Sequence, residues 1–249
     1  MRAIALLALA GCASAAGPAV NPTQAQWDDG LRRLEALRAT FPKSAYTQPV
    51  TVDFREPYTR RRFEGRGAVG VDPGRAMRMI LVGPAGEPAL DVWVTRDAWR
   101  MSVPAIHLVR RGGRDAPDGM PIGFFRSWFI DPLGGHLLAI GRHDDLVVRD
   151  GEGGTLDVSD VALAPRTSAH VRRRKARATE RFAFAMGKDG GTASYVSEST
   201  GLAALVKLGP VQSEPPDPQA FEDPGDPRSE AERGDERGAR GAKPFEDGR

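Results

Sequence analysis

Alternation of apolar and other side chains with a period of two, over residues 77–103, is the feature that most constrains how this chain can fold. The alternating positions fall into three consecutive segments, which predicts three β-strands that each turn one face to a core. Only residues 83–88 (GPAGEP) and 95–98 separate the segments. Links this short join antiparallel neighbours, because parallel strands need a longer crossover. The chain is therefore predicted to form an antiparallel sheet.

A helix over residues 23–41 is predicted to open the domain. Trp27, Leu31, Leu34 and Phe41 lie on one apolar stripe at helical spacing, and Pro42 ends the helix. The period of two returns downstream and predicts further strands near residues 136–141, 144–149, 154–164, 179–187, 192–199 and 202–209. The chain after the first helix is thus predicted to be a long antiparallel meander with one helical insert.

Residues 65–70 (GRGAVG) match the dinucleotide-binding pattern GxGxxG. That pattern binds a pyrophosphate only where a helix N-terminus follows it. Here Asp72, Pro73 and Gly74 follow instead, so the segment is predicted to be a glycine-rich strand.

The helical insert is predicted between Pro121, which can start a helix, and Pro132, which must stop it. It carries four large aromatic side chains: Phe124, Phe125, Trp128 and Phe129. Two interpretations stay open. The helix either caps the open end of a core or forms a lid over a ligand cavity.

Cys12 is the single cysteine of the 249 residues. Arg2 and an apolar run over residues 3–10 precede it, as in a secretory signal peptide, and the run is too short to span a membrane. Residues 9–12 (LAGC) resemble the bacterial lipobox, whose cysteine is acylated and becomes the mature N-terminus. An ordinary signal peptide with a chance cysteine is the alternative. The lipobox interpretation predicts removal of residues 1–11 and a membrane anchor through Cys12, with no internal disulfide.

Ala13 follows the cysteine, where an aspartate would keep a bacterial lipoprotein at the inner membrane. The predicted location is therefore the outer membrane, on its periplasmic face. Residues 12–21 are predicted to be a lipidated flexible tether and residues 22–212 a single domain. Residues 213–249 contain six prolines, no Ile, Leu, Val or Met, and 11 acidic against 6 basic side chains, which predicts a disordered acidic tail.

The motifs that carry chemistry give no support for catalysis, so the chain is predicted not to be an enzyme and to hold no cofactor. His143, Asp144 and Asp145 are adjacent, and neighbours on a strand point to opposite faces, so they predict a solvated turn and no metal site. No GxSxG elbow occurs, and acylation of Cys12 leaves no thiol nucleophile.

Residues 172–175 (RRRK) allow two interpretations, a solvated charged face or a surface that attracts anionic lipid head groups. Nucleic acid is not a predicted partner, because an exported protein rarely meets it.

Four features together resemble the LolA/LolB family of lipoprotein-localisation proteins. They are the lipobox, the helix with a QW pair at residues 26–27, the strand pair over residues 77–94 (MRMILVGPAGEPALDVWV) and residues 120–135 (MPIGFFRSWFIDPLGG). The similarity covers residues 27–135. It implies a mainly β (α+β) fold, an incomplete antiparallel β-barrel around an apolar cavity, with an N-terminal helix and a short lid helix.

The resemblance also implies a ligand and partners. The protein would be a monomer that binds acylated lipoproteins or other lipids, supplied by a LolA-like periplasmic carrier. Phe124, Phe125, Trp128 and Phe129 would form the lid, with Trp93 as a further candidate for lid or lining. The predicted acyl-cavity lining consists of Met77, Met79, Leu81, Leu90, Val92, Trp99, Met101, Phe182, Phe184 and Met186.

Pro84, Ala85 and Gly86 occupy the turn that would deliver cargo to the membrane. In the family this turn carries an exposed leucine, in N-P-L-G, that enters the bilayer. Burial of a leucine side chain is worth roughly 1.5 to 3 kcal/mol and that of alanine much less, so membrane insertion by this turn is predicted to be impaired. Delivery would then use another surface, such as residues 172–177, or the protein would bind acyl chains without inserting them.

Three functions stay open from the sequence. The first is an outer-membrane receptor that places lipoproteins in the membrane. The second is a lipid-binding or sensory envelope lipoprotein without delivery activity. The third is a structural envelope module whose acidic tail binds a partner.

Overall fold

The computed structural model describes residues 21–55, 62–115, 120–141, 143–151, 153–175, 177–212 and 214–225. Cys12, the signal peptide, most of the tether and residues 226–249 of the tail lie outside the described residues. Lipidation and processing at the N-terminus therefore stay predictions.

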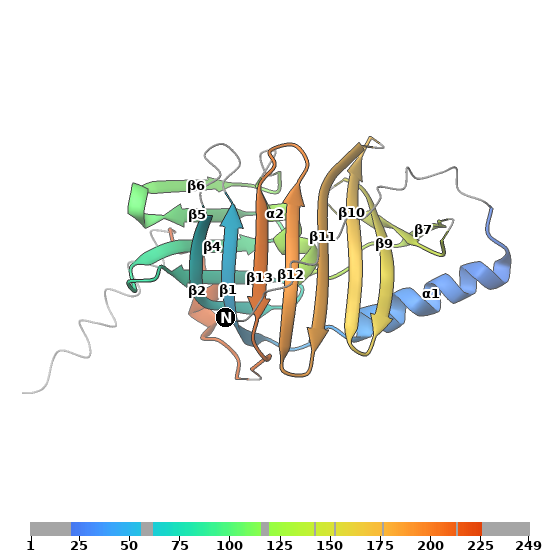
Figure 1. Cartoon of the computed structure of the whole chain (residues 1–249), viewed down its shortest axis with the longest axis horizontal. Helices are drawn as coiled ribbons and strands as arrows, with labels where there is room; N and C mark the ends of the chain where they lie inside the picture. The colour runs from blue at the N-terminus through green and yellow to red at the C-terminus, as the bar shows by residue number, and fades with distance from the viewer. Residues whose placement is uncertain are drawn as a thin grey trace, which may run out of the picture.

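Thirteen antiparallel strands form one sheet, so the protein is mainly β (Figure 1). Their order from edge to edge is β6-β5-β4-β3-β2-β1-β13-β12-β11-β10-β9-β8-β7. The edge strands β6 and β7 are not neighbours, so the sheet is not closed and the predicted incomplete barrel is confirmed. The strands are β1 (Tyr46–Arg55), β2 (Arg62–Asp72), β3 (Ala76–Val82), β4 (Pro88–Thr95), β5 (Trp99–Val103), β6 (Leu108–Gly112), β7 (Leu137–Ile140), β8 (Leu146–Asp150), β9 (Gly154–Leu163), β10 (Arg166–Arg174), β11 (Arg177–Gly187), β12 (Gly190–Ser197) and β13 (Ala203–Leu208).

The strands run as two meanders, β1 to β6 and β7 to β13, and not as the single meander predicted from the sequence. The meanders meet in the middle of the sheet, where β1 pairs with β13 and Val50 lies opposite Leu208. Between β6 and β7 the chain forms the helical insert, α2 (Ile122–Phe125) continued by the π-helical η2 (Arg126–Ile130). Pairing of the first strand with the last has no signature in a local pattern, which explains the difference.

Helix α1 (Gln24–Ala39) confirms the predicted N-terminal helix. Its start is fixed by a capping box, in which Thr23 and Gln26 each accept a hydrogen bond from the other's backbone N–H. Leu34 and Leu37 are its buried apolar residues, and the helix packs on β7 and β9. Gly30 allows close contact, because a Cβ atom there would lie 2.4 Å from the Ile140 side chain.

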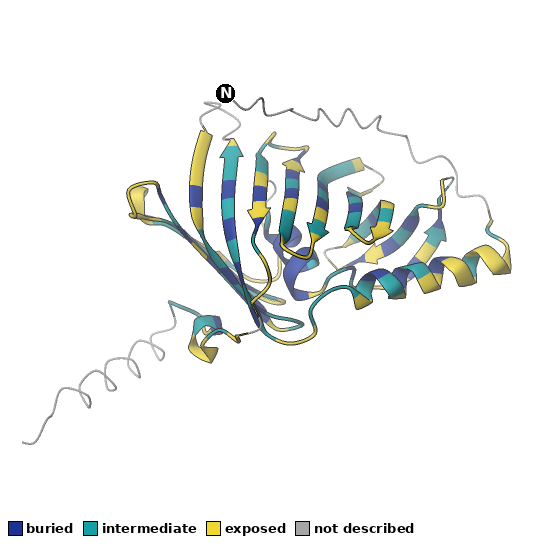
Figure 2. Ribbon diagram, turned by 60° about the horizontal axis from the view of Figure 1, so that its bottom comes forward, coloured by how far each residue is buried: buried dark blue, intermediate teal, exposed yellow. Residues whose placement is uncertain are grey.

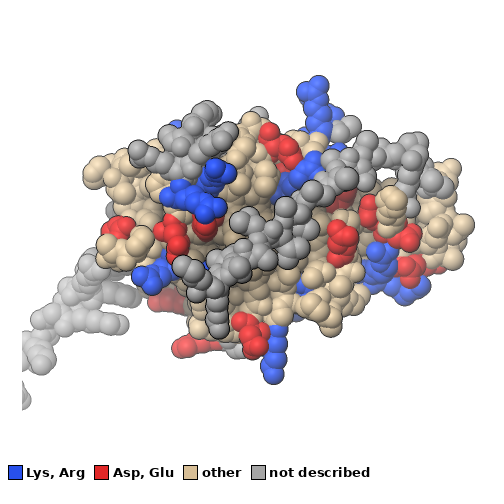
Figure 3. All heavy atoms as spheres, in the orientation of Figure 1, with Lys and Arg blue, Asp and Glu red and all other residues tan. Residues whose placement is uncertain are grey.

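The sheet is strongly curved, and Figure 2 shows the buried α2–η2 segment inside the curve. The opposite face, turned to the viewer in Figure 3, carries acidic and basic side chains interspersed. The predicted glycine-rich strand is β2. Gly67 lets β2 approach β3 closely, because a Cβ atom at this position would lie only 1.9 Å from the Ile80 carbonyl oxygen.

Three strands have no counterpart in the sequence prediction: β1, β6 and β10. β10 contains the basic residues 172–174, which the sequence analysis treated as a charged surface. Its buried positions are Ser168, His170 and Arg172. A search for alternating apolar residues misses such a strand, since its buried side chains are polar.

The predicted disorder from residue 213 onward is wrong for residues 214–225. This segment contains η3 (Pro218–Phe221) and lies on the outer face of the sheet, where Pro216 covers Gly70. Phe221 is buried, and its carbonyl oxygen accepts a hydrogen bond of 2.9 Å from the Trp93 indole. A buried aromatic side chain, the Trp93 indole and the contact of Pro216 with Gly70 together place an otherwise polar, proline-rich segment.

Candidate functional site

An apolar cavity of about 240 Å³ lies between the concave face of the sheet and the α2–η2 segment. Its walls come from both meanders, with β1, β3, β4 and β5 on one side and β12 and β13 on the other. Apolar side chains and the ring of one tyrosine line it: Val52, Phe54, Met79, Leu81, Leu90, Met101, Val103, Pro121, Phe124, Phe125, Trp128, Phe129, Ala193, Tyr195, Leu202, Ala204, Val206 and Leu208.

Burial of the lining side chains decreases toward one end of the strands. Val52 is buried but Phe54 is half-buried on β1, and Val206 is buried but Ala204 is half-buried on β13. The antiparallel order brings these half-buried positions to the same end of the sheet. We call this the mouth end; its strand termini are Arg55, Arg62, Val82, Pro88, Val103, Leu108, Ser197 and Ala203.

Phe63 extends the apolar surface beyond the mouth end. Its ring is stacked on that of Phe54, with centroids 5.1 Å apart, and Phe54 lines the cavity. Phe63 itself is 46% exposed. An apolar chain that leaves the cavity here meets a further aromatic surface and not water alone.

The α2–η2 segment is held by aromatic contacts on the side of β11 and β12. Phe124 packs on Phe182 and Tyr195, with ring centroids 5.4 and 5.0 Å apart. Trp128 meets Phe184 edge to face at 4.9 Å. The four predicted lid residues thus cover the cavity from inside the sheet and are themselves part of its wall.

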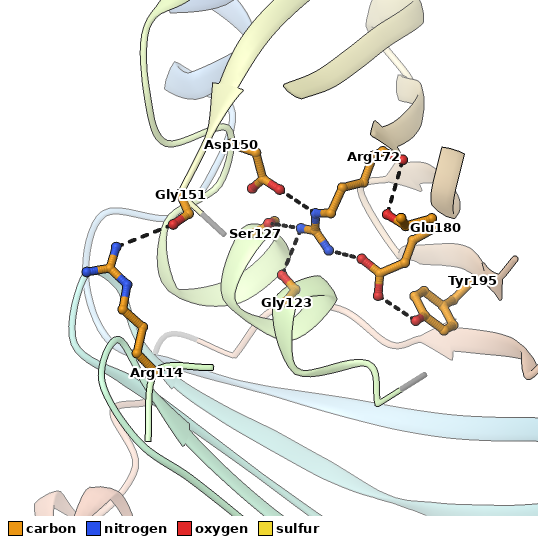
Figure 4. Close-up of polar contacts among 9 residues, drawn as sticks. Arg114, Gly123, Ser127, Asp150, Gly151, Arg172, Glu180 and Tyr195 are labelled. Atoms are coloured by element: carbon orange, nitrogen blue, oxygen red, sulfur yellow. Dashed lines mark hydrogen bonds and ion pairs between the residues drawn. The ribbon is translucent and has the colours of Figure 1, made fainter. Parts of the chain in front are cut away.

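Arg172 joins the α2–η2 segment to the sheet through a buried polar cluster (Figure 4). It is 1% exposed and projects from β10 toward Asp150 and Glu180, with both of which it forms an ion pair. Its Nη2 donates to the Gly123 carbonyl oxygen at 3.0 Å and to the Ser127 hydroxyl. The guanidinium therefore binds two strands of the sheet and two turns of the helical insert at once.

Tyr195 connects this cluster to the cavity. Its hydroxyl donates to Glu180 at 2.6 Å while its ring lines the cavity. Burial and the neighbouring Glu180 carboxylate raise the pKa of Tyr195 well above its usual value, so the phenol stays a proton donor. The cavity wall accordingly presents the ring and not the hydroxyl.

His170 lies beside the cluster, buried and packed against aromatic rings. Its ring is stacked on Phe182 at 4.7 Å, and Nε2 pairs with the Ser168 hydroxyl at 2.5 Å. Burial, followed by repulsion from Arg172, lowers the pKa of His170 to about 3. The imidazole is therefore neutral in the folded protein over the whole physiological range.

Of the ten residues predicted to line an acyl cavity, four line this apolar cavity: Met79, Leu81, Leu90 and Met101. Met77, Val92, Trp99, Phe182 and Phe184 are buried in the surrounding hydrophobic core and do not line the cavity. Met186 lies away from the cavity, in a surface depression of about 560 Å³ beside Pro42 and Pro165. Trp93 faces the opposite side of the sheet, against Phe221. For the predicted lining residues on β3, β4 and β5, alternation gave the correct face of the sheet. It did not show which positions along each strand reach the cavity.

The turn formed by Pro84, Ala85 and Gly86 is exposed and lies at the mouth end, between β3 and β4. Its location fits the predicted delivery loop, but its side chains present almost no apolar surface. The basic segment is only partly a surface: Arg174, Lys175 and Arg177 are exposed, whereas Arg172 is buried and Arg173 pairs with Asp157. The sequence prediction of a charged face or lipid-binding surface is therefore wrong for Arg172.

Two further properties of the described residues bear on the site. No helix there has the length and apolar character needed to cross a bilayer. The same residues contain no group of three or more His, Cys, Asp or Glu side chains that could hold a metal ion.

Comparison with known proteins identifies structural similarity alone. No protein-family model and no curated protein matches the sequence. A LolA superfamily protein from Nitrosomonas europaea has a TM-score of 0.52 with this chain at 11% identity, covering 78% of this chain and 97% of its own. A DUF1329 family protein from Desulfovibrio piger (TM-score 0.41, 13% identity, 82% and 98% covered) and a domain from Vibrio parahaemolyticus named for outer-membrane lipoprotein sorting (0.42, 8%, 78% and 97%) are more distant. The first similarity shows that the chain has a LolA-like fold.

Replacement of Arg172 by methionine is expected to lower the free energy of unfolding by about 3 to 5 kcal/mol, because two buried carboxylates lose their cation. Arg173→Met is the matched control. It removes a partly exposed pair with Asp157 and is expected to cost about 1 kcal/mol or less. Urea unfolding measures the free energy of unfolding of both variants. The double variant Arg172→Met with Glu180→Gln should recover part of the stability that Arg172→Met loses, because one of the two buried carboxylates is then neutral. Equal costs for the two arginines would contradict the assignment.

His170 is expected to make the protein less stable in mild acid. Its pKa of about 3 in the fold lies below the ordinary value of 6.5, so between these values only the unfolded chain binds the proton. Above pH 6.5 the buried imidazole lowers the free energy of unfolding little or not at all. Below pH 6.5 the free energy of unfolding decreases as the pH falls, because the unfolded chain binds the proton. Between pH 6.5 and 5.0 the loss is about 2 kcal/mol. Unfolding free energies of the wild type and of His170→Phe should show a flatter pH dependence in the variant, and parallel curves would refute this.

Proposed function

We propose that this chain is an outer-membrane lipoprotein that binds the acyl chains of lipoproteins in its apolar cavity and helps to place them in the outer membrane. The observation that carries the proposal is the apolar cavity under the α2–η2 segment of an incomplete barrel. The LolA-like fold supports it. In this proposal the protein is not an enzyme, is anchored through Cys12 and receives cargo from a LolA-like carrier.

The energetic need for such a site is large. A triacylated cysteine exposes on the order of 40 methylene groups, and at about 0.8 kcal/mol each its free passage through water would cost roughly 30 kcal/mol. A cavity with apolar walls removes this cost in proportion to the chain length that it buries. The unbranched side chains of Met79 and Met101 suit a ligand whose shape varies.

The size of the cavity limits what it holds without rearrangement. A cavity of about 150 Å³ accommodates one benzene molecule, so 240 Å³ is space for about ten carbon atoms. This corresponds to part of a single acyl chain. A triacylated cargo would require the α2–η2 segment to move away from the strands.

A second candidate function, lipid binding without delivery, is favoured by the same volume and by the turn at the mouth end. Ala85 gives this turn little ability to enter a bilayer. A purely structural module, whose interior would be filled by its own side chains, has no support from a cavity of 240 Å³.

Acyl binding is expected to depend on the free volume near Ala204. Ala204→Phe places a ring in the cavity and should weaken binding of a purified acylated lipoprotein at least about tenfold, since it excludes several methylene groups. Leu205→Phe is the control, because this exposed neighbour points to the outer face. Pull-down by the chain carrying Cys12→Ser, with the deacylated lipoprotein as competitor, measures the effect. If the acylated and the deacylated lipoprotein bind equally well, this function is excluded.

Delivery is expected to improve when the turn gains an apolar side chain. Ala85→Leu should increase the rate of lipoprotein transfer from the protein to liposomes, because leucine burial lowers the free energy of the membrane-bound encounter by about 1.5 kcal/mol or more. Ala85→Ser is the control, because it changes the turn without adding apolar surface. An unchanged rate in the leucine variant would mean that this turn is not the delivery surface.

A further inference from the structure

Charge on the concave face of the sheet is confined to few places. The strand register assigns every residue of the cavity-forming strands to the inner or outer face. On β1 to β5, β12 and β13, all inner-facing residues are uncharged. On the other strands, the inner-facing Arg172 pairs with both Asp150 and Glu180 in the buried cluster, and the inner-facing Arg166 lies over the Phe41 ring at the end of β10 opposite the mouth end.

Arg110 on β6 is the exception next to the cavity. It lies opposite Met101 in the β5–β6 pairing, and Met101 lines the cavity. Side chains of directly opposed residues project to the same face, with Cβ atoms about 5 Å apart. β6 is an edge strand, so nothing in the sheet lies beyond it (Figure 1). Arg110 therefore stands at the border of the apolar cavity.

The neighbouring arginine gives a direct contrast. Arg111 points to the outer face, where it pairs with Asp223 at 3.6 Å. Arg110 is exposed and forms no ion pair with any residue in the described ranges. A long cationic side chain beside an apolar cavity, with no carboxylate among the inner-facing residues of the cavity strands, favours a ligand that supplies the negative charge itself.

We propose that the cavity binds a single-chain amphiphile with an anionic head group, and that Arg110 pairs with that head group while the acyl chain lies under the α2–η2 segment. This inference rests on the proposed acyl-binding function and specifies its ligand class. The volume for about ten carbon atoms fits one chain. A carboxylate and a phosphate monoester share the required chemistry, and a fatty acid or a single-chain phosphatidic acid would supply it.

The test compares amphiphiles of equal chain length that differ only in charge. Isothermal titration of the whole chain carrying Cys12→Ser would use dodecanoate, dodecyl phosphate and the neutral dodecanol, each below its aggregation threshold. Both anions are expected to bind about tenfold more tightly than the alcohol, and the difference should shrink at high salt. Arg110→Gln should remove the difference and leave the alcohol affinity unchanged. Arg111→Gln, the matched control, should retain it.

The outcomes separate the two proposals. Equal binding of anion and alcohol by the wild type, or an anion preference that survives Arg110→Gln, would overturn the head-group assignment while acyl binding stands. Absence of binding by all three amphiphiles would overturn both. A preference for one anion over the other supports the assignment and identifies the carboxylate or the phosphate as the head group.

Discussion

Burial of the concave face is the constraint on which this structure depends. Thirteen strands present an apolar inner face, but the barrel is not closed and cannot bury that face by itself. Helix α1 covers the part near β7 and β9, and the α2–η2 segment covers the middle. The cavity lies between this segment and strands β1, β3, β4, β5, β12 and β13. The candidate site is thus the part of the core that is covered but not filled by side chains.

The buried Arg172 cluster lies on one side of the α2–η2 segment only. Carbonyl and hydroxyl oxygens of Gly123 and Ser127 bind the guanidinium, whereas Phe125 and Phe129 face the cavity. A buried ion pair contributes little net stability compared with apolar packing, but it is costly to break. The other side of the segment is anchored as well: the buried Arg126 of η2 donates from Nε to the Thr95 carbonyl oxygen at the end of β4 at 2.8 Å, and the Gly74 N–H donates to the Ile130 carbonyl oxygen at 2.6 Å. Directional hydrogen bonds therefore hold the segment from both sides, so enlargement of the cavity would have to break polar contacts and not apolar packing alone.

Sequence patterns predicted the type of fold and the face of each strand more reliably than the site itself. Period-two alternation identified β3 to β5 and the correct inner face for Met79 and Met101, because apolar burial is what alternation records. It could not show that Met79 lines the cavity while Met77 lies in the filled part of the core, since the position of the cavity along a strand depends on distant contacts such as the β1–β13 pairing. Arg172 was missed because a buried arginine and an exposed one look the same in sequence. Alternation of Ser168, His170 and Arg172 is the signal that would have identified the strand.

Ala85 and Arg110 have related consequences at the mouth end. If the protein delivers acyl chains as proposed, alanine at position 85 would slow transfer to the bilayer, because this turn gains little free energy by entering it, and would not weaken binding in the cavity. A cation that pairs with the head group, as proposed for Arg110, would add to the affinity of the cavity and slow release further. For a single-chain anionic ligand, Ala85 and Arg110 would both prolong the time that the ligand stays in the cavity. A neutral acylated lipoprotein would gain nothing from Arg110, so the two ligand classes would leave the same cavity at different rates.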